Sequence, residues 1–161
     1  CCNILVYINM VKPYLFLIIV MLTQNLFSQI KVAPMNPIWT NRVDSALKIV
    51  KKYDPDYYDT IIKYCKTIGF WRGGFSTVET NSDEITIAID DIKNPSINNI
   101  AAILVHESTH LYFIKNKISY PIEYEELLCY QTEKHFLLKI PNVEPFLLEN
   151  VEYRIKQFER D

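Results

Sequence analysis

A strongly apolar stretch over residues 97–114 contains three ionisable side chains within five positions, His106, Glu107 and His110. From residue 100 onward it is apolar on nearly every side of a helix, which is typical of a helix buried on most sides. Burying an ionisable group is unfavourable unless the group is paired, hydrogen-bonded or bound to a metal. The stretch therefore predicts a buried helix whose ionisable side chains share a partner.

The spacing of these three residues indicates what that partner is. Residues four apart in a helix lie one turn apart on the same face, so the imidazoles of His106 and His110 can converge on one zinc ion. Glu107 points to another part of the turn, where a glutamate does not ligate but acts as the general base on a zinc-bound water. The alternative is a pair of core histidines satisfied by hydrogen bonds.

A catalytic zinc ion keeps three protein ligands and one open position, so a third ligand is needed. The predicted helix after Pro121 offers three acids near its start. Helical geometry places Glu126 within an apolar face, Glu125 toward the edge of that face and Glu123 on the opposite flank. We expect Glu126 to ligate, with Glu125 second and Glu123 third. Alternatively, the helix dipole alone favours acids in a first turn.

Other polar residues follow on the same helix. Glu133 lies two turns after Glu126 on the same face and is a candidate for orienting a ligating histidine. His135 is too far along the helix to ligate, and we expect it to be solvated. Hydrolysis also needs a donor for the developing oxyanion, and the sequence does not select among three nearby tyrosines, which are Tyr120, Tyr124 and Tyr130.

The remaining periodicities predict an α+β fold. Apolar spacing predicts amphipathic helices over residues 42–53 and 57–67. Between them and the central helix, residues 70–79 and 84–90 have strand character, with turns at Gly73-Gly74 and residues 81–83. We therefore expect a small antiparallel sheet of two or three strands.

Local signals also set the bounds of the later helices. Ser96 is the expected N-cap of a helix from about 97 to 113. Pro121 opens a second helix that runs to about 140. Prolines separate that helix from a last one over about 146–158.

The composition excludes several classes of protein. With 49% hydrophobic and 22% charged residues, the chain is expected to form one compact domain and not a disordered segment. The net charge is −2 and the charged residues are scattered along the sequence, so no basic cluster indicates nucleic acid or anionic lipid as a partner. The four cysteines form no CxxC pair. In an oxidising compartment Cys65 and Cys129 could pair, or both remain buried thiols.

The N-terminal residues predict export. Lys12 precedes a short apolar run over residues 14–22, and Ser28 is a small residue at which cleavage can occur. We interpret residues 1–28 as a signal peptide, of which 1–9 belong to an over-extended gene start, and 29–161 as a single domain. The run is too short for a stable membrane span. Without cleavage, the segment would tether the protein to a membrane.

Two stretches carry a resemblance to a known group of proteins. Residues 101–110, Ala-Ala-Ile-Leu-Val-His-Glu-Ser-Thr-His, and the later Glu126-Leu-Leu-Cys-Tyr130 resemble the zincin metallopeptidases, and among them the gluzincins. The second stretch looks like the Glu-x-x-Ala-Tyr segment of several small members, and the chain length and element order are similar to those of the minigluzincins.

The chain also departs from related patterns. Tyr130 stands where the thermolysin-like motif has an acid, which leaves the histidine-orienting partner unassigned. Phe113 and Asn116 replace the glycine and histidine that the metzincin extension needs.

The resemblance implies a zincin-like fold and an exported zinc metallopeptidase that hydrolyses peptide bonds. It implies Zn²⁺ bound by His106, His110 and Glu126, with Glu107 passing a proton to the leaving amine. It further implies that Ile85–Ile89 is the edge strand along which a peptide or protein substrate pairs. Two alternatives are a latent or non-catalytic zinc-binding zincin with the 146–158 helix over its cleft, and a secreted helical interaction module without metal.

Overall fold

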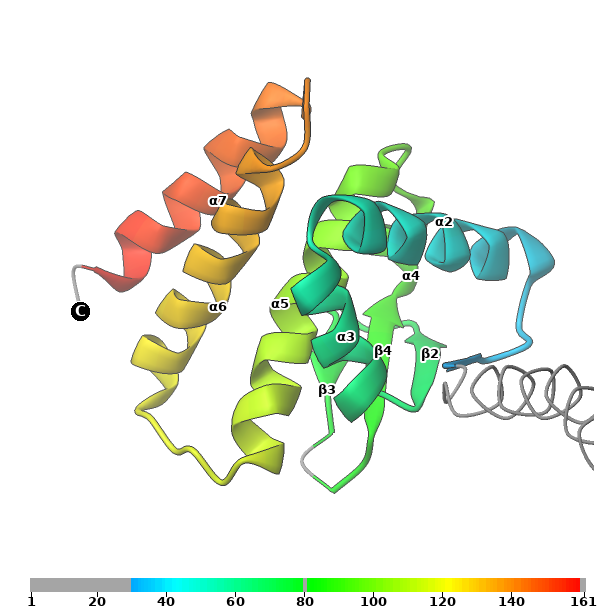
Figure 1. The fold of residues 1–161 in the computed structure, drawn as a ribbon, viewed down its shortest axis with the longest axis horizontal. Coiled ribbons are helices and arrows are strands. Elements are labelled where there is room, and N and C mark those ends of the chain that lie inside the picture. Colours follow the sequence, from blue (N-terminus) through cyan, green and yellow to red (C-terminus); the bar gives the residue numbers. More distant parts are fainter. Residues whose placement is uncertain (1–29, 80, 160–161) are drawn as a thin grey trace, which may run out of the picture.

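The computed structural model describes residues 30–79 and 81–159, and this part of the chain has an α+β architecture. Within these ranges there are six helices and one four-stranded mixed sheet (Figure 1). No described helix is both long and apolar enough to cross a membrane. The signal peptide expected over residues 1–28 lies outside the described residues.

The first two helices begin at capping residues. Helix α2 (Pro37–Tyr53) starts earlier than the periodicity predicts, because Asn36 accepts a hydrogen bond from the Ile38 N–H and proline occupies the first helical position. Helix α3 (Pro55–Tyr64) is capped in the same way by Asp54. It ends before the predicted boundary, because the backbone at Cys65 is extended and leads into a strand.

The expectation of an antiparallel sheet of two or three strands is wrong, because the sheet has four strands in the order β1-β2-β4-β3 and two of its three pairings are parallel. Its strands are β1 (Lys31–Val32), β2 (Thr67–Trp71), β3 (Thr77–Val78) and β4 (Glu84–Ala88). Strand β2 is parallel to both β1 and β4, and only β3 is antiparallel to β4. After β2 the chain passes to the edge of the sheet opposite β1 and forms β3 there. It then returns as β4 between β2 and β3, so that β4 is parallel to β2.

The strand expected at the edge of the sheet is therefore in its interior. Most of the segment Ile85–Ile89 belongs to β4, which is paired on both sides, and Ile89 already begins the short helix α4 (Ile89–Lys93). Ile85 and Ile87 are fully buried. An apolar strand of this kind suits a central position. The edge strand next to the helices is β3.

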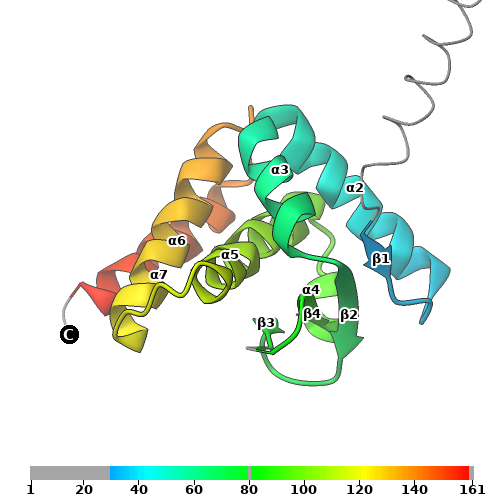
Figure 2. The ribbon, with the colours of Figure 1, turned by 60° about the horizontal axis from the view of Figure 1, so that its bottom comes forward.

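Helix α5 (Ile97–Lys115) lies at the centre of the molecule (Figure 2). Its predicted N-cap is confirmed, because the Ser96 side chain accepts from the Asn99 N–H. Helices α2 and α3 pack on one side of it, and α6 (Ile122–Leu138) packs on another. Helix α7 (Pro145–Phe158) packs along α6, so that the two form a hairpin beside α5.

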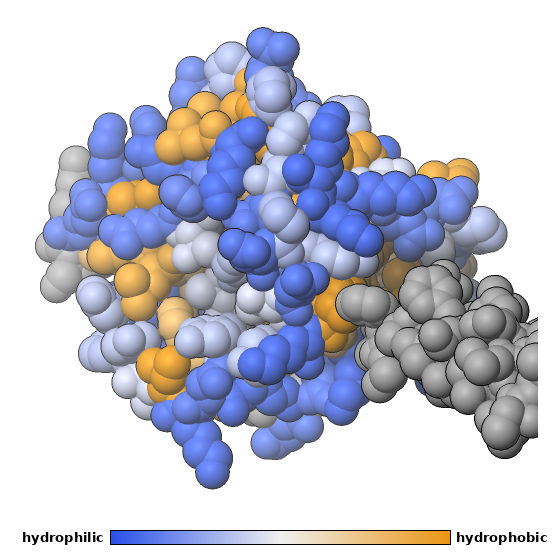
Figure 3. Space-filling model, viewed as in Figure 1, coloured by the Kyte–Doolittle hydropathy of each residue, from blue (hydrophilic) through white to orange (hydrophobic). Residues whose placement is uncertain are grey.

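One apolar core joins these elements. Its fully buried side chains come from α2, α3, the sheet, α4, α5 and α6, and include Val50, Ile61, Ile68, Ile87, Ile92, Leu104, Leu111 and Leu137. Hydrophilic residues predominate on the face drawn in Figure 3, with apolar residues scattered between them. The core holds α5 in place from several sides and thereby positions its polar residues.

Candidate metal centre and cleft

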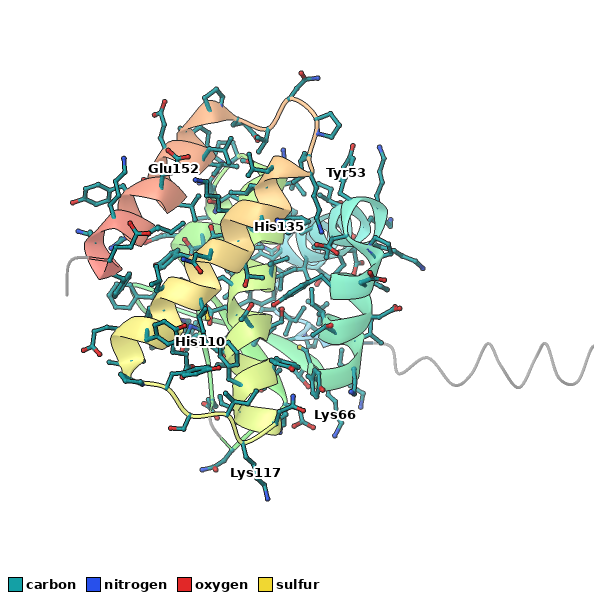
Figure 4. The ribbon with its side chains drawn as sticks, turned by 60° about the vertical axis from the view of Figure 1, so that its left-hand side comes forward. Tyr53, Lys66, His110, Lys117, His135 and Glu152 are labelled. Atoms are coloured by element: carbon teal, nitrogen blue, oxygen red, sulfur yellow. The ribbon has the colours of Figure 1, made fainter. Side chains whose placement is uncertain are left out.

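Helix α5 places two histidines one turn apart in a largely buried position. His106 is 7% exposed and His110 is 9% exposed, and their ring centroids are 5.1 Å apart. His110 lies between α5 and α6 in Figure 4. By contrast, the third histidine, His135, is exposed on α6, as expected from the sequence.

The carboxylate of Glu126 on α6 faces both imidazoles. Its Oε2 lies 3.5 Å from Nε2 of His106, and its Oε1 lies 3.4 Å from Nε2 of His110. These separations are longer than an ordinary N–H···O hydrogen bond. Nitrogen and oxygen ligands of one tetrahedral zinc ion, each about 2.1 Å from the metal, are about 3.4 Å apart. The spacing therefore fits a shared ion.

The other ring nitrogen of each histidine contacts a different carboxylate of α6. Nδ1 of His106 is 3.1 Å from Oε2 of Glu133, and Nδ1 of His110 is 2.7 Å from Oε1 of Glu125. A neutral imidazole that donates from Nδ1 carries its lone pair on Nε2. In that tautomer both lone pairs face the oxygens of Glu126, and either a cation between them or a proton on each Nε2 removes the repulsion.

The three acids ranked from the sequence have different positions. Glu126 faces both Nε2 atoms, whereas Glu125 contacts the far nitrogen of His110 and orients it. Glu123 is exposed. Glu133 contacts His106 in the orienting role that helical spacing suggested. Sequence reasoning missed the orienting role of Glu125, because its position at the edge of the face suggested only a reserve ligand.

Without a metal, the site is held by charge pairs. Burial is the largest influence on both histidines and lowers their pKa values, but the contacts with Glu126 and the orienting carboxylates outweigh it and raise them overall. Burial also raises the pKa of Glu126, but the contacts with the two histidines lower it by more, so that the pKa of Glu126 is about 2. In the absence of a metal these shifts favour protonated imidazoles paired with carboxylates, and a divalent cation can replace the protons.

Glu107 is the buried carboxylate that remains without a partner. It is 7% exposed and lines the same cleft as the histidines. Among the described side chains, none donates a hydrogen bond to it. Burial raises its pKa to about 7, against the opposing effect of His106 and His110. A carboxylate in this state can accept a proton from a water in the cleft near neutral pH.

Cys129 offers a second possible ligand from α6. One ligand atom from each of His106, His110 and Cys129 lies within 4.8 Å of the others. The thiol is fully buried, does not line the cleft, and has a pKa raised by burial. Glu126 lines the cleft and faces both Nε2 atoms, so we favour it. Cys129 and Cys65 are both free, so the alternative of a disulfide between them is not observed.

The histidines and Glu107 open into a cleft of about 820 Å³. The edge strand β3 forms one wall, and α5 and α6 form the others. Three of its lining side chains are exposed and apolar: Trp71, Phe75 and Ile122. The indole N–H of Trp71 donates to the Phe75 carbonyl at 2.7 Å, which fixes the loop that presents Phe75. The cleft can therefore take up apolar groups beside the polar site.

Only one of the three candidate tyrosines lines this cleft. The Tyr130 ring is 4.5 Å from the His106 ring between centroids. Tyr120 and Tyr124 contact each other, with centroids 5.2 Å apart, and both are exposed. Geometry thus favours Tyr130 where sequence position did not distinguish the three.

Comparison with known proteins provides no family for this chain. No family model matches it, and no curated protein or solved structure matches it either. The function of the site is therefore inferred from its own geometry and chemistry.

Proposed function

We propose that this protein is a zinc-dependent peptidase whose metal is held by His106, His110 and Glu126. One observation carries the proposal: both Nε2 atoms face one carboxylate at 3.4–3.5 Å, while both Nδ1 atoms are held by other carboxylates. Structural histidines satisfied by hydrogen bonds need no such convergence of Nε2 atoms.

The chemistry of the donor set fits zinc. Two neutral imidazoles and a carboxylate are ligands that zinc accepts in catalytic sites. Three further carboxylates, Glu107, Glu125 and Glu133, surround them, so a divalent cation offsets the accumulated negative charge. When bound, zinc would polarise the scissile carbonyl and lower the pKa of a water molecule to about 7.

The residues of the chain supply the proton transfers. Glu107 takes the proton from the attacking water and delivers it to the leaving amine. Its position in the cleft without a competing partner supports this role. Among the described residues, the cleft holds no second carboxylate of this kind beside the histidines, because Glu125, Glu126 and Glu133 all contact an imidazole.

The edge strand supports a peptide as the substrate. Strand β3 pairs with β4 on one side only, and it lines the cleft next to α5. An extended peptide can add to such an edge through main-chain hydrogen bonds, which would position a peptide carbonyl along the cleft. A mixed sheet with this edge beside the His-Glu-His helix, followed by a helix with a facing glutamate, is similar to the zincin arrangement.

A second candidate is a zinc site that does not turn over. The proximity of Cys129 to both histidines favours it, because a fourth protein ligand would close the site. The related idea of a latent form covered by α7 has less support. Helix α7 packs along α6, and of its described residues only Arg154 lines the cleft.

The substitution Glu107→Gln separates these candidates. The amide keeps the size of the side chain but cannot accept the proton, so we expect zinc to be retained and peptide hydrolysis to fall by about 10²- to 10⁴-fold. Glu123→Gln, on an exposed carboxylate, is the matched control and should retain wild-type activity. Hydrolysis by the Glu107→Gln protein at the wild-type rate would contradict the proposed base. Zinc binding without hydrolysis by the wild type would favour the closed site.

A further inference from the structure

Arg154 on α7 is the only lysine or arginine among the described residues that line the cleft. Several carboxylates line the same space, and three of them already contact histidines. We propose that Arg154 binds a carboxylate of the substrate, so that the preferred peptides carry a carboxylate close to the bond that is cleaved. This inference rests on the proposed peptidase function.

A chain of ring contacts places Arg154 on the His106 side of the site. Phe158, four residues after Arg154 and on the same face of α7, stacks on Tyr130 with ring centroids 5.8 Å apart. Tyr130 in turn contacts His106. Arg154 therefore lines the cleft on its Tyr130 side, which is the side of His106.

The guanidinium has no carboxylate partner within the described part of the chain. Its Nη1 contacts only the side-chain oxygen of Gln157, at 3.5 Å. The acid two residues before it, Glu152, is paired instead with Lys134 at 2.9 Å. An exposed arginine without an ion pair can offer its planar fork to an incoming carboxylate in a bidentate contact.

The charges in the rest of the cleft determine where such a carboxylate binds. Asp91 lines the sheet side and accepts a hydrogen bond from Ser76, and Glu107 lies beside the histidines. Both repel an anionic group. A substrate carboxylate is therefore favoured near Arg154 and disfavoured near Asp91 and Glu107.

Two groups of a peptide have this chemistry, the C-terminal carboxylate and an aspartate or glutamate side chain. The test uses the full chain carrying Glu107→Gln, loaded with zinc, so that peptides bind without being hydrolysed. Calorimetry compares a short apolar peptide with a free C-terminus, its C-terminally amidated form, and an amidated form that contains one glutamate. Zinc content is measured on every sample.

We expect Arg154→Ala to weaken binding of the carboxylate-containing peptides by about tenfold to a hundredfold and to leave the amidated apolar peptide unchanged. Arg154→Lys should restore part of the affinity, because the charge remains without the fork. Lys156→Ala, on an exposed side chain of the same helix that does not line the cleft, is the control. If only the peptide with a free C-terminus depends on Arg154, the C-terminal carboxylate is the group that binds. If only the glutamate-containing peptide does, an acidic side chain is the group that binds.

Equal affinity for the free and both amidated peptides, or an affinity that Arg154→Ala does not change, would overturn the inference. If the wild type still binds zinc and cleaves peptides in that case, the proposed function remains. A chain that binds no zinc would overturn both.

Discussion

Nδ1 of His106 lies 3.1 Å from Oε2 of Glu133, a residue 27 positions later on the neighbouring helix. Glu125 makes the equivalent contact with His110 at 2.7 Å. Helix α6 thus contributes the facing carboxylate and also sets the orientation of both imidazoles. The proposed metal site depends on how α5 and α6 pack, and not on the His-Glu-x-x-His spacing alone.

Removing an orienting carboxylate should weaken zinc binding without abolishing it. We expect Glu133→Gln and Glu125→Gln each to lower zinc affinity by about tenfold to a hundredfold, because the amide holds the imidazole less firmly and lowers its basicity. Titration of zinc against a competing chelator measures the change. Glu123→Gln is the exposed control. Unchanged affinity in both variants would show that these contacts do not support the metal.

Two substitutions on one face of α6 distinguish the possible third ligands. Glu126→Ala should abolish stoichiometric zinc binding, because it removes the oxygens that face both Nε2 atoms. Cys129→Ala should retain one zinc per chain. Metal analysis of the purified variants gives the answer directly, and the opposite pattern would identify the thiol as the ligand.

Asp83 connects the β3–β4 hairpin to two lysines, Lys66 and Lys115, and these contacts lower its pKa to about 2. A carboxyl whose pKa is lower in the folded state stabilises the fold above its unfolded pKa, and loses that effect as pH falls toward the folded value. The melting temperature of the wild type should therefore exceed that of Asp83→Asn by a constant margin from about pH 5 to 7, and this margin should shrink as pH falls and vanish only below about pH 2. A margin independent of pH throughout would exclude this charge effect.

Glu144 joins the start of α7 to the start of α5. Its carboxylate accepts hydrogen bonds from Ser96 Oγ at 2.7 Å and from Asn98 Nδ2 at 2.8 Å. Glu144→Ala should lower the free energy of unfolding by about 1 kcal/mol in a denaturant titration. The loss is small because the carboxylate is partly exposed to solvent, which weakens its hydrogen bonds. Glu144→Gln should lose less, and Glu149→Ala, on an exposed side chain of α7, should change little. Equal stability of wild type and Glu144→Ala would show that the contact is without effect.

Local signals in the sequence were sufficient to predict the central helix. Its apolar run, the Ser96 cap and the spacing of His106 and His110 each depend on neighbouring residues, and α5 has the expected start and buried face. Helical periodicity likewise predicted that Glu126 lies on the face that packs toward α5. Helical periodicity does not predict which residue of a neighbouring helix a flexible side chain contacts. For this reason the contact of Glu125 with His110 was missed.

The sheet shows where sequence patterns are insufficient. Strand β3 has only two residues, and its position at the edge depends on β4 inserting between β2 and β3. Such pairing joins segments that are not adjacent in the chain, and alternation of apolar residues indicates a strand without indicating its neighbours. The alternating isoleucines therefore predicted a strand correctly, but the assignment of that strand to the edge was wrong.

The most direct measurement is the zinc content of the purified full chain after incubation with excess zinc and desalting. One zinc per folded chain, lost in His106→Ala and in His110→Ala but not in His135→Ala, is the predicted result. A wild-type chain that folds normally and retains no zinc would contradict a metal centre at these residues, and with it the proposed peptidase.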